Sequence, residues 1–167
     1  MKTAKISPCG TYRYNLTRRW DEGGKTMLFV MLNPSTADAD VDDPTIRRCV
    51  GFAKRDGYSA IEVVNLYAFR ATDPDRLFGV SIREIIGPDN NEEIRAAAQR
   101  ADRVVAAWGA GRHATFTDGG AGRWRVVAEL IKSLGKPIYC LNTSASGQPR
   151  HPLYVRADQP LLYWMGP

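Results

Sequence analysis

The stretch that decides the fold is Thr26–Leu32, TMLFVML, which is followed directly by Asn33 and Pro34. The run is apolar without alternation, and such a short run is typical of a strand that is buried on both faces. Strands of this kind occur in parallel sheets that are covered by helices on both sides. The run therefore predicts a buried strand of a parallel sheet, with Asn33 at its carboxyl end.

Three further apolar runs predict strands of the same sheet. They are IEVVN at 61–65, RVVAA at 103–107 and PIYCL at 137–141. Helix signals alternate with these strands: Asp43 can cap a helix that Pro44 begins and Gly57 ends. The other two helices are expected at 91–101, capped by Asn91, and at 124–134, ended by Gly135.

The alternation of strands and helices predicts an α/β fold built from βαβ units. We expect a three-layer sandwich around a central, mostly parallel four-stranded sheet. Residues 12–20 are rich in strand formers, and the break at 21–24 predicts an N-terminal β-hairpin that leads into the strand at 26–32. The sequence has no linker and no repeat, so residues 1–167 are expected to form a single domain.

Composition narrows the class of protein. The chain has 167 residues, of which 44% are hydrophobic and 25% charged, which excludes disordered and fibrous classes. It contains no apolar leader and no run near the roughly 20 residues that cross a bilayer. We therefore expect a cytoplasmic protein that does not contact a membrane. A monomer is the expected oligomeric state.

Charge and metal ligands bear on the expected partner. The net charge of +5 favours a polyanion, so DNA or a nucleotide is the expected partner. The three cysteines are too far apart for a zinc pair. The acidic run 38–43 begins like a calcium loop but has Asp43 where glycine is needed. We therefore expect no metal and no cofactor.

Polar residues follow each predicted strand, and ligands of open α/β sheets bind at these carboxyl ends. Asn33 can orient a water molecule, although Asn-Pro alone more simply marks a turn. Asn65 can read the edge of a base, or it can bond to its own turn. The segment 108–111 is glycine-rich, which suits either an anion or close packing of a strand on a helix. His151, held between two prolines, can act as an electrophile or an acid, or can be structural.

Four motifs carry a resemblance that extends over most of the chain: LNPSTAD at 32–38, DDPTIRRC at 42–49, NLYAFRAT at 65–72 and RHPLY at 150–154. With them, the sequence resembles a bacterial and phage domain family to which no activity is attached. The strand-end segments also resemble, more distantly, the uracil-DNA glycosylase superfamily, whose first motif places a catalytic Asp or Asn before proline. Its later motifs are a base-reading Asn, a Trp-Gly exit and a late His-Pro pair.

The glycosylase resemblance implies a set of site residues. It implies Asn33 and His151 as the catalytic pair. It implies a base- or ligand-binding set, which comprises Pro34, Ser35, Asn65, Tyr67, Phe69, Trp108 and Asn142. The basic composition adds five candidate phosphate contacts, which are Arg47, Arg48, Arg70, Arg112 and Arg150.

Two departures from the glycosylase pattern leave alternatives open. His151 follows its expected strand end by about ten residues, so Asn142 can fill the late-motif position instead. Tyr67 and Phe69 are the nearest candidates for the aromatic side chain that stacks on a base, but they come from a different loop. The resemblance thus implies a DNA glycosylase-like hydrolase that acts on a flipped, modified or damaged base.

Two other functions remain open. The fold can serve as a nucleic-acid or nucleotide binding module without chemistry, which the absence of a carboxylate at position 33 favours. It can also serve as a hydrolase or transferase of free nucleotides. A basic groove across the strand ends would favour DNA, whereas a closed small pocket would favour a free nucleotide.

Overall fold

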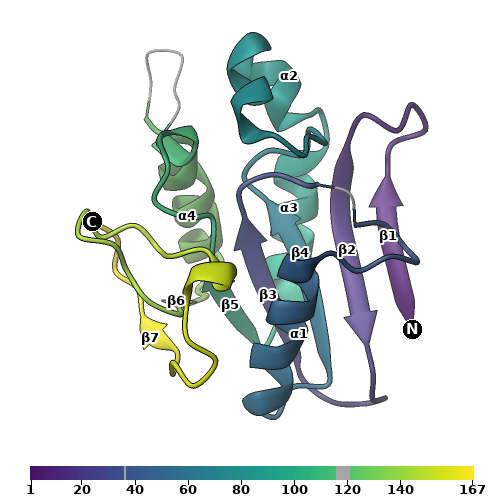
Figure 1. The fold of residues 1–167 in the computed structure, drawn as a ribbon, viewed down its shortest axis with the longest axis vertical. Helices are drawn as coiled ribbons and strands as arrows, with labels where there is room; N and C mark the ends of the chain where they lie inside the picture. The colour runs from purple at the N-terminus through teal and green to yellow at the C-terminus, as the bar shows by residue number, and fades with distance from the viewer. Residues whose placement is uncertain (36, 116–120) are drawn as a thin grey trace.

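The computed structural model describes residues 1–35, 37–115 and 121–167, and its core is one mixed sheet (Figure 1). Among these residues the sheet has seven strands in the order β1-β2-β4-β3-β5-β6-β7. The four inner strands are parallel, and the outer pairings are antiparallel. The strands are β1 (Lys2–Ile6), β2 (Arg13–Arg19), β3 (Thr26–Met31), β4 (Ala60–Asn65), β5 (Arg103–Ala106), β6 (Ile138–Cys140) and β7 (Leu162–Tyr163).

The expected sheet of four strands is wrong in its size. The four predicted strands are the parallel centre β4-β3-β5-β6, and β1, β2 and β7 extend it at both edges. The expected hairpin between 12–20 and 26–32 does not form, because β2 pairs with β1 and β4 rather than with β3. The N-terminal hairpin is β1–β2 instead, and the antiparallel pairing of β2 with β4 directs the start of β2 towards the carboxyl end of β4.

Helices cover both faces of the sheet, which makes three layers (Figure 1). The helix α1 (Pro44–Arg55) lies on one face together with the 3-10 turn η3 (Pro152–Tyr154). The helices α3 (Asn90–Arg100) and α4 (Arg123–Ser133) pack together on the other face. Three short helices complete the described chain: η1 (Pro74–Gly79), α2 (Ile82–Ile86) and η2 (Arg112–Thr115). None of the described helices has the length and apolarity to cross a membrane.

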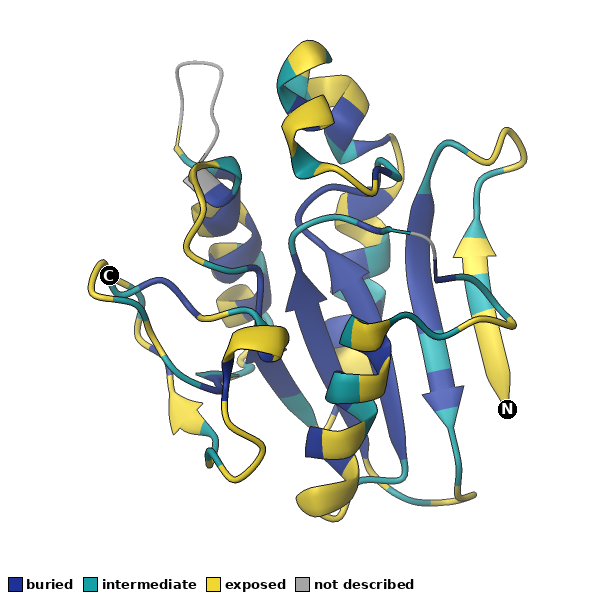
Figure 2. Cartoon of the chain, viewed as in Figure 1, coloured by how far each residue is buried: buried dark blue, intermediate teal, exposed yellow. Residues whose placement is uncertain are grey.

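The apolar run at 26–32 is buried on both faces, as its composition predicts (Figure 2). Met27, Phe29 and Met31 pack into the core under α1. Leu28 and Val30 pack into the second core, under α3 and α4. Because successive side chains of a strand point to opposite faces, only an unbroken apolar run can supply both cores.

The predicted cap of α1 is confirmed, whereas α3 begins one residue before its predicted cap. The Asp43 carboxylate accepts a hydrogen bond from the Ile46 amide at 2.8 Å, and Gly57 after the helix has φ of +77°. The expected cap Asn91 lies inside α3, which begins at Asn90. The side chain of Asn91 accepts a hydrogen bond from buried Arg123 at 2.7 Å instead.

The strand order creates a crevice at the carboxyl end of β3. The helix α1 follows β3 on one face of the sheet and leads to β4, whereas α4 follows β5 on the opposite face and leads to β6. The connections after β3 and β5 therefore diverge. In open α/β sheets this reversal is the usual place for a ligand.

Candidate functional site

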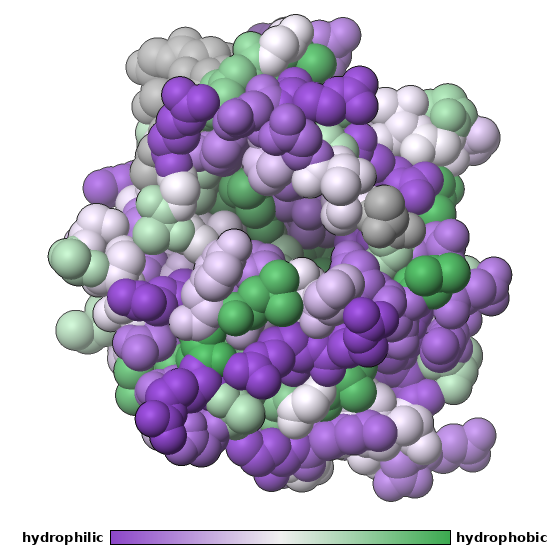
Figure 3. All heavy atoms as spheres, in the orientation of Figure 1, coloured by the Kyte–Doolittle hydropathy of each residue, from purple (hydrophilic) through white to green (hydrophobic). Residues whose placement is uncertain are grey.

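A pocket of about 820 Å³ lies at this reversal, between the carboxyl ends of the strands and the start of α1. Its wall includes residues 31–33 after β3, 108–111 after β5, the start of α1 and the segment 150–154. Figure 3 shows it as a hollow with apolar residues in its floor and hydrophilic residues around its rim. Its volume falls within the range of roughly 300–1,000 Å³ that holds small organic ligands.

Asn65 is the least satisfied polar group in the pocket wall. It is the last residue of β4, and its side chain is 1% exposed. Neither its Oδ1 nor its Nδ2 has a hydrogen-bond partner among the residues that the structure describes. A buried, unpaired polar group costs about 1–3 kcal/mol, so two such atoms in one amide represent a substantial loss that a ligand can recover. An amide offers a donor beside an acceptor, which matches the edge of a base.

Asn33 also lines the pocket, and its orientation is fixed from behind. Its Nδ2 donates to the carbonyl oxygen of Ala71 at 2.8 Å and to that of Pro34 at 3.2 Å. Its Oδ1 accepts no hydrogen bond from the described residues. The amide is therefore held with its Oδ1 free, and this oxygen can accept a hydrogen bond from a bound water molecule.

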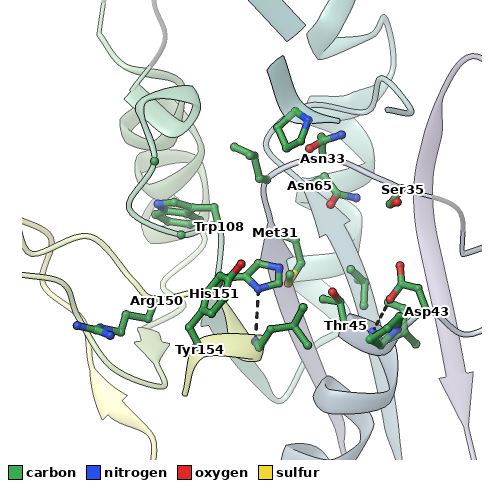
Figure 4. Close-up of a pocket in the computed structure, with 18 of the residues that line it drawn as sticks. Met31, Asn33, Ser35, Asp43, Thr45, Asn65, Trp108, Arg150, His151 and Tyr154 are labelled. Atoms are coloured by element: carbon green, nitrogen blue, oxygen red, sulfur yellow. Dashed lines mark hydrogen bonds between the residues drawn. The ribbon is translucent and has the colours of Figure 1, made fainter. Parts of the chain in front are cut away.

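His151 faces Asn33 and Asn65 across the pocket, from the segment before η3 (Figure 4). Its Nδ1 accepts a hydrogen bond from the Leu153 amide at 3.3 Å. This bond places the proton of the neutral ring on Nε2. Burial lowers the pKa of His151 below its ordinary value, and the charge of Asp43 opposes this effect in part. The ring is consequently a neutral hydrogen-bond donor at neutral pH.

Trp108 and Gly109 form the wall after β5. Trp108 is buried, and its Nε1 donates to Gln148 at 2.9 Å. Its ring meets that of Trp164 edge to face, with centroids 5.1 Å apart. Gly109 has φ of +87°, and a side chain there would lie 3.7 Å from Cβ of His151. The backbone beside His151 therefore adopts a left-handed conformation at Gly109, which glycine adopts without strain.

Two charged residues of the pocket, Arg13 and Asp43, were not predicted as site residues. Leu16 packs into the core under α1, so regular alternation would point Arg13 to the opposite face. The register of β1 and β2 skips Tyr14, and this bulge turns Arg13 towards the pocket. Asp43 was interpreted as a helix cap, with a catalytic carboxylate in the acidic run 38–43 as the less favoured alternative. The sequence contains no motif that indicates the role of Arg13.

Four of the predicted ligand-binding residues do not line the pocket. Tyr67 is fully buried in the core, and its hydroxyl donates to the carbonyl of His113 at 2.8 Å. Phe69 packs against the same core and meets Tyr12 edge to face. Pro34 is buried behind Asn33. Asn142 does not line the pocket, and its Oδ1 accepts a hydrogen bond from the Thr143 amide at 2.8 Å. Of the two candidates for the late motif, the pocket therefore contains His151.

Among the five arginines that were predicted to contact phosphate, Arg150 alone lines the pocket. Its side chain points outward in Figure 4. The other four bond elsewhere within the chain. Arg47 donates to the carbonyl of Asp42, Arg48 to those of Pro152 and Val155, Arg70 to that of Gly10, and Arg112 to the Asp75 carboxylate.

The described residues contain no group of three or more His, Cys, Asp or Glu side chains placed to bind a metal ion. What the pocket offers is an unpaired amide, a second amide with a free acceptor, a neutral imidazole donor, one carboxylate and one buried guanidinium. Asn33, Asn65 and His151 thus share a single cavity, together with Ser35 and Trp108 (Figure 4). Such a set can bind a polar, planar ligand and place a water molecule beside it.

Comparison with known proteins gives one match. No curated protein and no solved structure matches the chain. One family model, described as "Protein of unknown function (DUF1643)", matches residues 13–153. This match spans most of the chain, including β2 to β6 and all of the residues that line the pocket except Tyr154. The chain therefore belongs to the DUF1643 family.

Proposed function

We propose that the pocket binds a nucleobase and that the protein is a DNA glycosylase-like hydrolase. The observation that carries this proposal is the buried amide of Asn65, which has neither a donor nor an acceptor paired. A base that presents an acceptor beside a donor would satisfy both atoms at once. A base within a duplex cannot enter a pocket of this kind, so the nucleotide would be flipped out of the stack.

The proposed reaction adds water across the N-glycosidic bond. The Oδ1 of Asn33 holds the water near the sugar carbon, whose bond to the base breaks as the new C–O bond forms. The base leaves with the bonding electrons, and the Nε2–H of His151 stabilises its negative charge. A neutral imidazole can take this role, because its Nε2–H donates a hydrogen bond to the leaving base without the ring first having to gain a proton.

The proton released by water needs an acceptor, and we assign it to Asp43. This residue is the one carboxylate among the described residues that line the pocket. One oxygen, Oδ1, caps α1, which leaves Oδ2 for a proton. The Asp43 carboxylate can act as the general base, a role that the neutral amide of Asn33 cannot fill.

A second candidate is nucleotide binding without chemistry. The observation in its favour is that Asn33 donates to two backbone carbonyls, so its amide also has a structural use in the loop after β3. In that case the same pocket would bind a base and leave the glycosidic bond intact. The two candidates differ in turnover and share the role of Asn65.

The test is incubation with single- and double-stranded oligonucleotides that carry a panel of damaged and modified bases, with abasic sites as the readout. We expect abasic sites for at least one base. The variant Asn65→Asp should change which base is cleaved, because a carboxylate only accepts where the amide also donates.

Two variants separate the chemical step from binding. Asn33→Ala should slow the single-turnover rate and leave substrate affinity nearly unchanged. His151→Ala should slow it by about 10²–10³-fold, by analogy with the loss of an oxyanion-hole donor. Base-specific binding that depends on Asn65, with no abasic sites from any substrate, would favour the binding module instead.

A further inference from the structure

Arg13 is a buried positive charge without a counter-ion in contact. Arg13 is 2% exposed, and it lines the pocket from the start of β2. One nitrogen, Nη1, donates to the carbonyl of Ala37. Its Nε is buried without a partner, and its Nη2 makes no hydrogen bond to the described residues. The guanidinium therefore has two of its three nitrogens unused.

The charges around Arg13 do not neutralise it. Asp43 and Asp38 favour its charged form, whereas Arg18 and Arg70 oppose it. No carboxylate of the described residues lies within 4.0 Å of the guanidinium, the distance that defines an ion pair. Burial dominates the balance and lowers the pKa of Arg13 to about 10. Removal of a charge from water without a close partner is costly, and an anion bound in the pocket would offset this cost.

Arg18 on the same strand provides the contrast. It is 3% exposed, as deeply buried as Arg13, but it bonds to the Asp42 carboxylate at 2.6 Å. It also donates to the carbonyl oxygens of Asp38 and Thr17. Each nitrogen of the Arg18 guanidinium thus donates a hydrogen bond within the protein, as expected for a structural arginine. Arg13 differs in its unused nitrogens and in facing a cavity.

We propose that Arg13 is an anion subsite of the pocket and that it binds the phosphate of the nucleotide whose base Asn65 reads. The inference rests on the proposed base-binding function for the identity of the ligand, and on the unpaired guanidinium for its charge. A guanidinium presents parallel N–H donors that match two phosphate oxygens. The phosphate can belong to a free nucleoside monophosphate or to the backbone beside a flipped nucleotide.

The test compares three ligands by calorimetric titration: a nucleoside, its 5′-monophosphate and a short single-stranded oligonucleotide that contains the same base. The base is chosen from the panel described above, and the four common bases are used if none is cleaved. We expect the wild-type protein to bind the monophosphate, the oligonucleotide or both at least about tenfold more tightly than the nucleoside. In Arg13→Met this preference should disappear.

Arg18→Met is the matched control. It also removes a buried guanidinium from β2, and it should lower the free energy of unfolding but keep the preference for phosphate. If Arg13→Met does not fold, Arg13→Lys and competition of inorganic phosphate with the nucleotide on the wild-type protein replace it. We expect inorganic phosphate to compete with the monophosphate and to have no effect on nucleoside binding.

The outcomes distinguish this inference from the proposed function. Equal affinity for all three ligands, or a phosphate preference that survives in Arg13→Met, would overturn the subsite. Base selectivity that depends on Asn65 would stand in either case. Conversely, a phosphate preference that Arg13→Met removes, without any selectivity between bases, would support the subsite and overturn the role of Asn65. Preference for the oligonucleotide alone would identify the phosphate as a backbone diester.

Discussion

At the scale of single residues, the protonation of His151 has a measurable consequence for stability. Burial lowers its pKa in the folded protein, so between the folded pKa and the ordinary value of about 6.5 the unfolded chain binds more protons. Stability should therefore fall as the pH drops below about 6.5 and should not change through this group above it. His151→Gln should weaken this pH dependence, as measured by urea denaturation across the range. Identical pH profiles would contradict the prediction.

Some residues of the site could be predicted from their position at the end of a strand, and others could not. Asn33, Asn65 and Trp108 follow apolar runs directly, and the carboxyl-end rule was sufficient to predict that they meet. Tyr67 satisfies the same rule, but its chain turns inward and buries the ring in the core. Arg13 could not be predicted, because its orientation depends on a bulge between strands whose pairing the sequence does not reveal.

At the scale of elements, the start of α1 combines a structural role with a proposed chemical one. Asp43→Ala removes the cap and should lower the free energy of unfolding by about 1 kcal/mol. Asp43→Asn keeps a cap of similar quality, so its stability should stay near that of the wild type. If Asp43 accepts the proton of water, Asp43→Asn should still abolish most of the turnover. Full activity in a stable Asp43→Asn protein would exclude that role.

The strands show which part of the fold a sequence can predict. Those of the parallel centre are buried on both faces, so their apolar runs stand out from the flanking loops. The strand β1 is largely exposed and β7 has two residues, both exposed, so neither has a periodicity to detect (Figure 2). The residues of β2 were recognised as strand formers, but they pair with β1, which precedes them in the chain, and with β4, and not with the next strand β3.

At the scale of the whole molecule, the net charge of +5 is not concentrated in the side chains that line the pocket. Of the predicted phosphate contacts only Arg150 lines the pocket, and Arg13 adds one more. Each phosphate contact with a single strand contributes about −0.7 to the slope of log affinity against log salt, so two contacts give about −1.4. Fluorescence anisotropy of a labelled single strand measures this slope. A much steeper slope would indicate a wider DNA-binding surface.

The bulge at Tyr14 makes the charge of the pocket depend on the register between β1 and β2. Insertion of one residue between Lys5 and Ile6 of β1 would give Tyr14 a partner and restore strict alternation along β2, and the arginine at the strand's start would then face the layer of α3. Such an insertion would replace the cation at the pocket with the side chain of Tyr14, while the sheet kept its pairing. A one-residue insertion at this point of β1 would therefore alter ligand charge preference in a single step, with no substitution in any motif.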